Sequence, residues 1–438
     1  MLIQFSVSNF RSFSHPAVFS MVGGREGIHP DHLIKGSHAR DISLQRLAVI
    51  YGANASGKSN FTKALSFMKE LVIRGRRPNE GMRRQVFRLG GDWSQQPSLF
   101  EIDIKEGGQL FHYGFKINDQ TVQEEWLEER TRDRSKVLFF RKTTEDGQTE
   151  VDIQRLGKGL SKLEVDNLGF IARGTRANQL FLTETMERNQ ESLRPIYGWF
   201  QNRLTVISPD SSSLGLEVMV DESRDFNHYL SDLLAEADTG IEGIKAQTME
   251  LDELGLSRQV KKELEESSGR ALLVFGSKGN RFRIQKTSEG IQTSKLTTVH
   301  NGVDFDIEDE SDGTRWLIDL AAAFYQLTTR SESKVYVIDE LGHSLHLHLI
   351  ELLLSHFLKE SVQSPGQLIF TTHQPQLLSL KRFRRGEIWF VEKTPEHGTE
   401  MYSLLEFKKE ARYDKDILKA YLEGRYGGIP RLGLAVGD

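Results

Sequence analysis

Apolar residues occur in short continuous runs near both ends of the chain, and each run is bounded by glycines or acids. Residues 47–51 and 335–338 are apolar or aromatic throughout, and residues 367–372 follow the same trend. Runs of this length are typical of strands buried on both faces of a parallel sheet. After the first run, the apolar spacing of residues 59–73 predicts a helix. The two ends of the chain are therefore expected to form one α/β core.

The middle of the chain follows two other patterns. Apolar residues fall at every second position in 99–104, 110–117 and 137–140, with Gly, Asp and Asn between these segments, which predicts short antiparallel strands. Helical spacing follows at 178–203 and in a charged, glycine-interrupted stretch at 224–268. The remaining predicted elements are a first strand within 1–13, strands at 271–275 and 281–284, and a helix at 316–326.

These changes of pattern divide the chain into four parts. We expect a first core lobe, a β-rich region with the helices that follow it, a helical and β insertion, and a second core lobe. Their bounds are 1–84, 85–205, 206–300 and 301–438. The predicted fold class is α/β, with an antiparallel β region and a short helical insertion.

Composition narrows the class of protein. The chain has 438 residues, of which 38% are hydrophobic and 27% charged, as in soluble globular proteins. The most apolar stretch, 317–327, is interrupted by Asp319 and is too short to span a membrane, and the start lacks the pattern of a signal peptide, so we expect a cytoplasmic protein. The absence of cysteine excludes disulfides and thiol catalysis. A net charge of −5 gives no overall attraction to nucleic acid.

The first segment with recognisable chemistry is Gly52-Ala-Asn-Ala-Ser-Gly57-Lys58-Ser59, which fits G-x-x-x-x-G-K-S/T between a predicted strand and a predicted helix. Glycines let such a loop turn so that its backbone N–H groups face phosphates. Lys58 would reach the β- and γ-phosphates, and the Ser59 hydroxyl would bind Mg²⁺. We count Asn54 and Asn60 among the nucleotide contacts as well. The cofactors expected at this loop are ATP and Mg²⁺.

Two acids end the strand at 335–338. Asp339 suits coordination of Mg²⁺, and Glu340 suits polarisation of the attacking water. The next strand, 367–372, ends at His373, whose imidazole could donate to the γ-phosphate or hold the water. Because carboxyl ends of parallel strands meet at one edge of a sheet, these groups are expected beside the phosphate loop.

A second anion-binding helix start lies further along the chain. In Glu310-Ser311-Asp-Gly313-Thr-Arg315, Ser311 offers a hydroxyl and Gly313 an unobstructed N–H group at the start of a helix. Since the phosphate loop already occupies one side of the phosphates, this second helix implies that another subunit closes the nucleotide site.

These motifs, in this order, resemble those of the ABC-type ATPases of the RecF and SMC group, and Asn9-Phe-Arg-Ser-Phe13 is similar to that group's first strand. Three segments resemble bacterial OLD-like ATPases more closely, a group that includes the ATPase components of abortive-infection systems such as AbiL and PARIS. They are Asp339-Glu-Leu-Gly-His-Ser-Leu-His346, Glu310-Ser-Asp-Gly-Thr-Arg315 and Tyr421-Leu-Glu-Gly-Arg-Tyr-Gly-Gly428.

The resemblance implies an ABC-type head that forms a homodimer or higher homo-oligomer around ATP. It assigns Glu340 as general base, His373 as the switch histidine, and Ser311 with Gly313 as the signature that contacts ATP from the partner copy. Residues 344–346 would form the turn that links the two sites, and Gln85 is a weaker candidate for the glutamine that senses Mg²⁺. The Ser-Asp-Gly-Thr signature departs from the transporter-like Ser-Gly-Gly-Gln. OLD nucleases carry a C-terminal TOPRIM domain, for which the chain after His373 is too short, so any nuclease would be a separate polypeptide.

Several weaker features have ordinary explanations. His343, His346 and His348 do not converge on one helix face, which favours turn or structural roles over a metal site. Basic clusters at 74–84 and 381–385 could contact phosphate backbone or an acidic partner, or they could be solvated surface. The stretch 251–268 could be a helical arm for a partner protein or a solvated helix.

We therefore interpret the sequence as an ATPase that acts as a sensor or regulator in phage defence, with a separately encoded effector, nuclease or toxin, and a DNA or phage-protein trigger. One alternative is a DNA-repair clamp of the RecF type, which binds DNA directly. A P-loop kinase is disfavoured, because the Asp-Glu and histidine arrangement comes without an acceptor-site signature.

Overall fold

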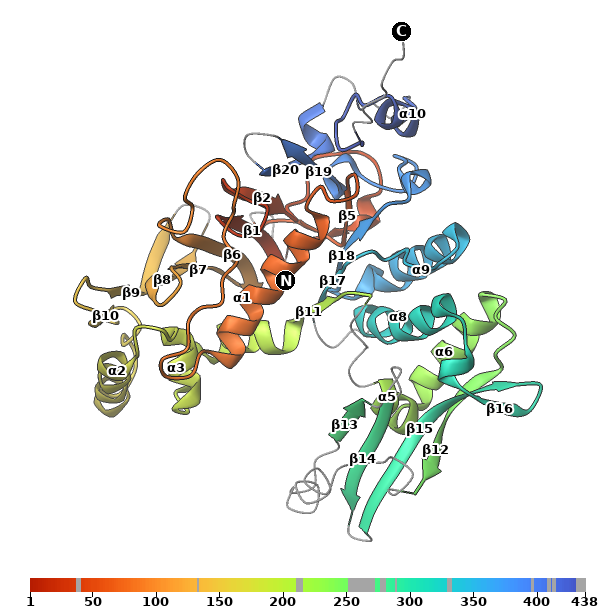
Figure 1. Cartoon of the computed structure of the whole chain (residues 1–438), viewed down its shortest axis with the longest axis horizontal. Helices are drawn as coiled ribbons and strands as arrows, with labels where there is room; N and C mark the ends of the chain where they lie inside the picture. Colours follow the sequence, from red (N-terminus) through yellow and green to blue (C-terminus); the bar gives the residue numbers. More distant parts are fainter. Residues whose placement is uncertain are drawn as a thin grey trace. The chain divides into compact units, whose positions relative to one another are not determined.

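The structure, a computed structural model, describes most of the chain in two compact units (Figure 1). The first unit consists of Met1–Ser208, Arg330–Leu341 and Leu358–Asp438, and the second of Pro209–Thr329 and Gly342–Phe357. Each unit is treated by itself below. The described residues are 1–36, 41–131, 134–209, 216–250, 272–275, 281–287, 290–328, 333–394, 398–407, 411 and 415–430.

A mainly parallel sheet carries the predicted chemistry of the first unit. Its strand order is β11-β17-β18-β5-β19-β20, and only β20 runs antiparallel to its neighbour. The strands are β5 (Leu47–Tyr51), β11 (Leu204–Ile207), β17 (Val335–Ile338), β18 (Gln367–Thr372), β19 (Ile388–Thr394) and β20 (Gly398–Ser403). Since Ile338 pairs with Phe370 and Thr372 with Tyr51, the carboxyl ends of β17, β18 and β5 lie at one edge. The strands predicted at both chain ends are confirmed.

An antiparallel sheet forms the other layer of this unit, with strand order β10-β9-β8-β7-β6-β1-β2. Its strands are β1 (Leu2–Ser8), β2 (Ala17–Ser20), β6 (Ser98–Glu106), β7 (Gln109–Ile117), β8 (Val122–Arg130), β9 (Ser135–Thr143) and β10 (Thr149–Asp152). A small pair, β3 (Leu33–Ile34) and β4 (Leu44–Gln45), stands apart from it. The predicted α/β class with an antiparallel β region is confirmed.

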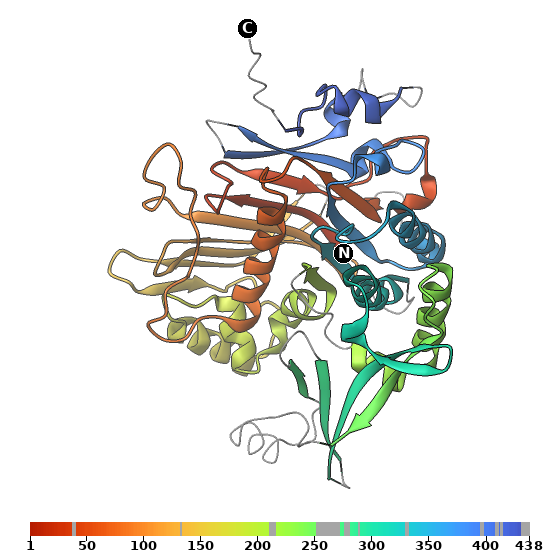
Figure 2. The ribbon, with the colours of Figure 1, turned by 45° about the vertical axis from the view of Figure 1, so that its right-hand side comes forward.

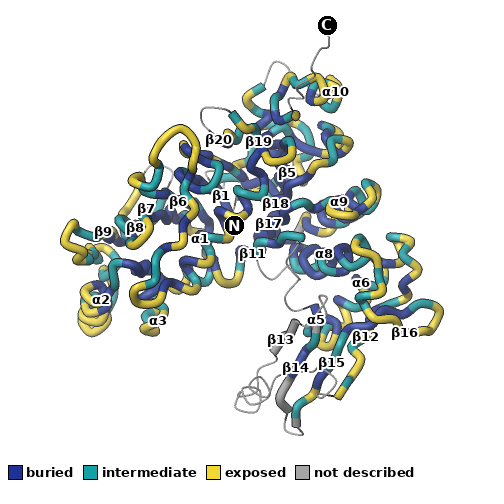
Figure 3. The backbone as a smooth tube through the Cα atoms, in the orientation of Figure 1, coloured by how far each residue is buried: buried dark blue, intermediate teal, exposed yellow. Residues whose placement is uncertain are grey.

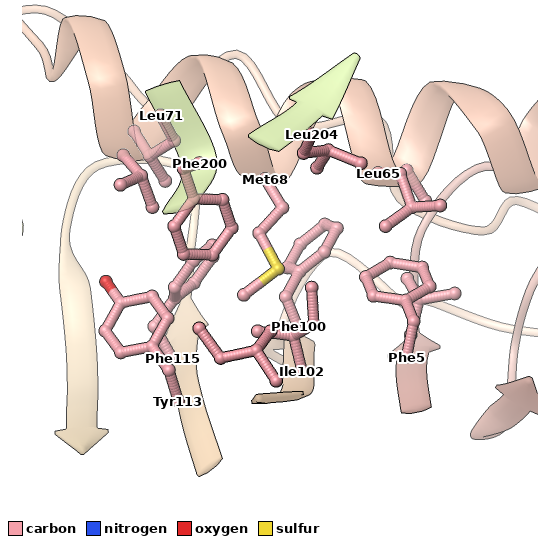
Figure 4. Packing of buried hydrophobic residues seen from close by; sticks show 14 of the residues in the cluster. Phe5, Leu65, Met68, Leu71, Phe100, Ile102, Tyr113, Phe115, Phe200 and Leu204 are labelled. Atoms are coloured by element: carbon pink, nitrogen blue, oxygen red, sulfur yellow. The ribbon is translucent and has the colours of Figure 1, made fainter. Parts of the chain in front are cut away.

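Helix α1 (Lys58–Arg74) runs along one face of the antiparallel sheet (Figures 1 and 2). Its apolar residues recur at helical spacing, and Phe61 meets Phe5 of β1 edge to face, with ring centroids 5.7 Å apart. Figure 4 shows Leu65, Met68 and Leu71 of the helix directed into the same cluster. Each such fully buried side chain contributes about 1.5–3 kcal/mol, which fixes the helix that begins at the phosphate loop.

Figure 3 shows buried residues along the central strands and on the inner face of this helix, and β5, β17 and β18 are buried throughout. The helical pattern at 178–203 corresponds to several short helices, while α2 falls in a stretch for which no helix is predicted. The other α-helices of the first unit are α2 (Lys162–Gly174), α3 (Phe181–Glu187), α4 (Arg194–Gly198) and α10 (Ile417–Leu422), and a π-helix covers Trp199–Arg203. The 3₁₀ turns are Pro30–His32, Glu191–Leu193, Ile307–Asp309, Ser361–Gln363, Pro375–Leu377, Arg385–Glu387 and Leu404–Phe407.

The second unit combines helices with a small antiparallel sheet, in which β15 pairs with β12, β14 and β16, and β14 also pairs with β13. The strands are β12 (Gly243–Met249), β13 (Leu272–Phe275), β14 (Arg281–Thr287), β15 (Gly290–His300) and β16 (Val303–Asp306). The helices are α5 (Leu216–Glu222), α6 (Arg224–Glu236), α8 (Asp312–Thr328) and α9 (Leu347–Glu360), whose last turn belongs to the first unit.

One prediction here is wrong in part. The charged stretch at 224–268 does not continue as a helix, because α6 ends at Glu236 and β12 follows it. Two residues past the helix end, Asp238 adopts φ +53°, and Gly240 adopts φ +73°, so the chain cannot continue as a helix, and the next segment pairs with β15 from Gly243 to Met249. The proposed helical arm at 251–268 lies outside the described residues. Within the described part, no helix is long and apolar enough to cross a membrane.

Candidate nucleotide-binding site

The glycine-rich loop joins β5 to α1 and turns sharply at two points. Gly57 caps the helix at φ +118°, and a Cβ at this position would lie 2.3 Å from Thr399 Oγ1. A Cβ at Gly52 would lie 2.4 Å from the carbonyl oxygen of Val391. Both positions therefore require glycine, for backbone conformation at Gly57 and for close packing at both.

A cavity of about 530 Å³ lies in front of this loop, and all of its lining residues belong to the first unit. It is lined by Asn54, Ala55, Ser56, Gly57, Lys58, Ser59, Asn60, Glu340 and His373. Residues from three strand ends, distant in sequence, thus face one space. The structure brings together residues 54–60 of the predicted loop, Glu340 and His373. Asp339 precedes Glu340 in the chain but is not among the lining residues, and Gly52 lines a neighbouring cavity.

Lys58 is held at the centre of the loop. Its Nζ donates to the carbonyl oxygens of Gly52, at 2.7 Å, and Ala53, at 2.9 Å, and lies 3.3 Å from His373 Nδ1. Burial lowers the pKa of Lys58 to about 8, and the nearby carboxylates of Glu340 and Asp339 oppose that shift. The amino group is therefore much less basic than an exposed lysine.

The two acids differ in their surroundings. Asp339 is buried at 6% exposure, and its Oδ1 accepts a hydrogen bond of 2.7 Å from the hydroxyl of Thr371. Glu340 has φ +53°, which is unusual for a residue other than glycine, and its backbone N–H donates to the same hydroxyl at 2.7 Å. The side chain of Glu340 reaches forward, so that its Oε1 lies 3.1 Å from His373 Nε2.

His373 links the loop to the acids. When Lys58 carries its proton, it can only donate, so His373 Nδ1 accepts from it and Nε2 bears the hydrogen that is donated to Glu340. The imidazole in that arrangement is neutral. His373 thus lies between the loop lysine and Glu340.

The far end of the cavity is tied to the segment after β1. Asn60 Nδ2 donates to Ser12 Oγ at 2.8 Å, and Thr399 donates its backbone N–H to the carbonyl of Ser12 and its hydroxyl to the carbonyl of Ser56. Of these residues, Asn60 is predicted from the sequence as a nucleotide contact, and Ser12 belongs to the segment that resembles a first strand. Thr371 and Thr399 are missed, because their roles depend on pairing between distant strands.

A second cavity, of about 580 Å³, adjoins the other side of the loop. The tail segment that resembles OLD-like ATPases forms part of its wall through Tyr421 and Gly428. The ring of Tyr421 stacks on Phe390 at 5.4 Å and lies 6.0 Å from that of Tyr51, the residue before the loop. The tail therefore supports the strand that enters the phosphate loop.

Ser311 and Gly313 lie in the second unit. The hydroxyl of Ser311 accepts from the backbone N–H of Thr314 at 3.1 Å, as a helix cap does. A Cβ at Gly313 would lie 2.4 Å from the carbonyl oxygen of Ser344, so the start of α8 packs directly against the 344–346 turn. Glu310 anchors the segment to β15, since its Oε1 accepts from the hydroxyl of Thr298 at 2.6 Å.

Gln85 is exposed and lies outside the lining of the 530 Å³ cavity; its backbone carbonyl accepts from Arg11 N–H. His343 precedes α9, and the rings of His346 and His348 lie 5.0 Å apart. In the described part of the chain, no group of three or more His, Asp or Glu side chains could hold a metal ion by itself.

Several basic side chains of the clusters at 74–84 and 381–385 are buried, so fewer of them are exposed than the sequence suggests. Arg384 is fully buried and donates to backbone carbonyls of the segment 24–29, while Arg385 pairs with Glu26 at 3.3 Å. In the other cluster, Arg76 and Arg84 are buried. These three arginines are therefore not available to phosphate backbone or to an acidic partner; the exposed arginines and lysine of the two clusters are Arg74, Arg77, Arg83, Lys381 and Arg382.

Comparison with known proteins identifies a protein family that matches most of the chain. A family model described as "AAA domain, putative AbiEii toxin, Type IV TA system" matches residues 47–379, from the start of β5 to beyond His373. Two solved structures are weakly similar, each at 13% sequence identity. The SMC head domain from Thermotoga maritima has a TM-score of 0.39, with 92% of this chain and 98% of that chain covered. The SmcHead bound to the C-winged helix domain of ScpA has a TM-score of 0.41, with 93% and 99% covered. No curated protein matches the sequence.

Proposed function

The chain belongs to this family of AAA-domain proteins, and on that premise we propose that it is an ATPase, which binds ATP with Mg²⁺ and hydrolyses ATP to ADP and phosphate. One observation carries the proposal. Lys58, Glu340 and His373 line a single cavity of about 530 Å³ together with the N-terminus of α1. A helix N-terminus and a lysine attract phosphates, while a carboxylate with a histidine beside it can orient water.

The residues present fit a magnesium ion that arrives with the nucleotide. Asp339 directly precedes Glu340, and its carboxylate, which accepts a hydrogen bond from Thr371, would bind the cation or its water. Ser59 contributes a hydroxyl to the cavity. When bound, Mg²⁺ would neutralise charge on the β- and γ-phosphates.

The chain's own groups account for the remaining steps. Backbone N–H groups of the loop and Lys58 hold the phosphates, for which Lys58 must exchange its bonds to Gly52 and Ala53 for bonds to phosphate oxygens. Glu340 orients a water and accepts its proton as the water attacks the γ-phosphorus, and the bond to the β-phosphate oxygen breaks. His373 holds Glu340 in place before the attack.

The proposal includes an ABC-type assembly in which two copies face each other head to tail. Ser311 and Gly313 of one copy would complete the phosphate site of the other. Ser311 sits at the start of α8 with its side chain exposed, and the N–H groups of that helix start are suited to an anion.

We further propose that this ATPase acts in the cytoplasm as the sensor or regulator of an OLD-like phage-defence system, with a separate effector. The family description, which names a toxin and a toxin–antitoxin system, supports a role in conflict between phage and host. A DNA-repair clamp remains the alternative, and retention on duplex DNA in an ATP-dependent manner, without a partner protein, would favour it.

The first test is hydrolysis by the purified chain. We expect release of phosphate from ATP that requires Mg²⁺ and is lost in Lys58→Ala. Lys63→Ala is the matched control, because Lys63 lies on the same helix with an exposed side chain. Wild-type protein that binds no ATP, or equal activity in the two variants, would contradict the proposal.

A further inference from the structure

We propose that Thr371 is a positioning residue that sets the geometry of both acids at the end of β17. This inference rests on the proposed ATPase function and deepens it. Thr371 belongs to β18, between the strand that leads to the phosphate loop and the strand that ends in Asp339 and Glu340. It is fully buried, so its hydroxyl must find its partners inside the protein.

Three hydrogen bonds join Thr371 to three consecutive residues. Its Oγ1 donates to Asp339 Oδ1 at 2.7 Å and accepts from the N–H of Glu340 at 2.7 Å. Its backbone carbonyl accepts from the N–H of Leu341 at 3.1 Å. The turn that follows β17 is thereby fixed to the neighbouring strand.

The hydroxyl is the only part of the side chain that can make both contacts. A hydroxyl has one hydrogen to donate and lone pairs to accept, so it can serve a carboxylate and an N–H group together. The donated bond orients the carboxylate of Asp339. The accepted bond stabilises Glu340 at φ +53°, a conformation that is otherwise unfavourable for glutamate.

The orientation of Glu340 follows from its backbone. With the N–H of Glu340 turned back to β18, its side chain reaches into the cavity, where Oε1 lies 3.1 Å from His373. Without the hydroxyl, the N–H of Glu340 and Oδ1 of Asp339 would lose their partner in a buried place, and the turn would relax. Thr371 should therefore affect catalysis more than binding, because the loop and Lys58 make no contact with its hydroxyl.

The next residue provides a matched control. Thr372 is also buried, at 1% exposure, but the side chains of a strand alternate between faces. Its hydroxyl accepts from the N–H of Gln374 at 3.1 Å and takes no part in the acid turn. Loss of a buried threonine hydroxyl at this strand end can thus be separated from loss of this particular one.

The experiment compares Thr371→Val, Thr371→Ser and Thr372→Val in the full chain, by steady-state hydrolysis, ATP binding in the absence of turnover, and thermal melting. Thr371→Val keeps the shape and removes the hydroxyl, so we expect kcat to fall about ten- to a hundredfold, with ATP affinity within about threefold of wild type. Thr371→Ser restores a hydroxyl and should recover most of kcat, and Thr372→Val should resemble wild type.

The outcomes are distinguishable. Wild-type kcat in Thr371→Val, or an equal loss in Thr371→Val and Thr371→Ser, would overturn the positioning role while leaving the ATPase proposal intact. Absence of hydrolysis in the wild-type protein would instead refute the proposed function, and the inference with it. If Thr371→Val melts too low to be assayed, the contrast between Thr371→Ser and Thr371→Ala decides the matter, since both shorten the side chain and only one keeps the hydroxyl.

Discussion

His373 Nε2 lies 3.1 Å from Glu340 Oε1, so the carboxylate proposed to orient the water is already paired with a histidine that follows the neighbouring strand. The other nitrogen of the same ring lies 3.3 Å from Lys58 Nζ. Histidine therefore connects the lysine proposed to hold the phosphates to the carboxylate proposed to orient the water. Binding of a nucleotide at Lys58 would change the hydrogen bonds at both ends of this connection.

Replacement of Glu340 by glutamine should separate binding from hydrolysis. The amide keeps the shape of the side chain but cannot accept a proton from water, so we expect single-turnover hydrolysis to fall about a hundredfold or more. ATP binding should persist, because the loop and Lys58 are unchanged. Glu360→Gln, at the exposed end of α9, is the control. Hydrolysis near wild type in Glu340→Gln would remove this residue from its role.

The affinity for ATP should decrease as the pH rises through about 8. Burial holds the pKa of Lys58 near 8 in the nucleotide-free protein, and the phosphates bind the protonated amine. Binding must therefore take up a proton above that pH, which costs up to about tenfold in affinity per pH unit until the pKa of the bound state is reached. Titrations of ATP binding from pH 6.5 to about 9.5 measure the effect.

The control for this titration is Lys58→Arg, whose side chain stays charged throughout the range. Its affinity, weaker or not, should be independent of pH above 8. A slope in this variant equal to that of the wild type would assign the pH dependence to another group.

A bulky substitution of Ser311 should block the site of the partner copy. Ser311→Arg should leave ATP binding at the phosphate loop intact and reduce hydrolysis to a negligible level. Mixing it with Lys58→Ala protein creates heterodimers that contain one site with both native residues, so part of the activity should return. Full activity of Ser311→Arg alone, or no recovery on mixing, would contradict the shared site.

The stability of the first unit should depend on Glu125. Its buried carboxylate accepts from the N–H groups of Phe181 and Leu182 at the start of α3, at 2.6 and 3.1 Å, and from the hydroxyl of Tyr113 at 2.9 Å. Glu125→Ala leaves all three donors unpaired, so we expect a loss of about 2–4 kcal/mol in the free energy of unfolding. The measurement is denaturation in urea.

The neighbouring residue gives the matched variant for that measurement. Glu124 pairs with Lys116 at 2.8 Å on a partly exposed face, so Glu124→Ala should cost less than about 1 kcal/mol. Equal losses in the two variants would show that burial of the carboxylate is not the cause.

The output of the ATPase should depend on a second protein. We expect a tagged chain purified from its native operon to retain a partner, and to retain more of it in Glu340→Gln, in which bound ATP is not consumed. The exposed basic residues, such as Arg83 and Lys381, would make an acidic partner's binding sensitive to salt. Recovery of the chain alone in both states, together with DNA cleavage or toxicity of the isolated protein, would refute this prediction.

The core of the site could be predicted because its parts are local patterns. The loop from Gly52 to Ser59, the acids after β17 and His373 after β18 each follow an apolar strand, and parallel strands bring their carboxyl ends to one edge. Thr371 could not be predicted in this way, because its role depends on the register between β18 and β17.

Exposure was the least predictable property. Arg384 sits in a basic sequence that suggests solvent, yet its guanidinium is buried against carbonyl groups of a segment from the other end of the chain. Likewise, the charged composition after α6 is compatible with helix, and only its pairing with β15 makes Gly243–Met249 a strand. Both outcomes depend on residues that are far away in the sequence, and local composition carries no information about them.

The contact between Gly313 and the carbonyl of Ser344 leaves no room for even a methyl group. The start of α8 and the turn after the two acids must then shift together within a subunit. In a head-to-tail dimer, Ser311 of one subunit would bind the triphosphate held by the other subunit. That contact would displace the 344–346 turn, which follows Glu340 in the subunit that contributes Ser311. ATP binding at one site would therefore affect the other site. The rate of hydrolysis should rise with ATP concentration as a sigmoid curve rather than a hyperbola.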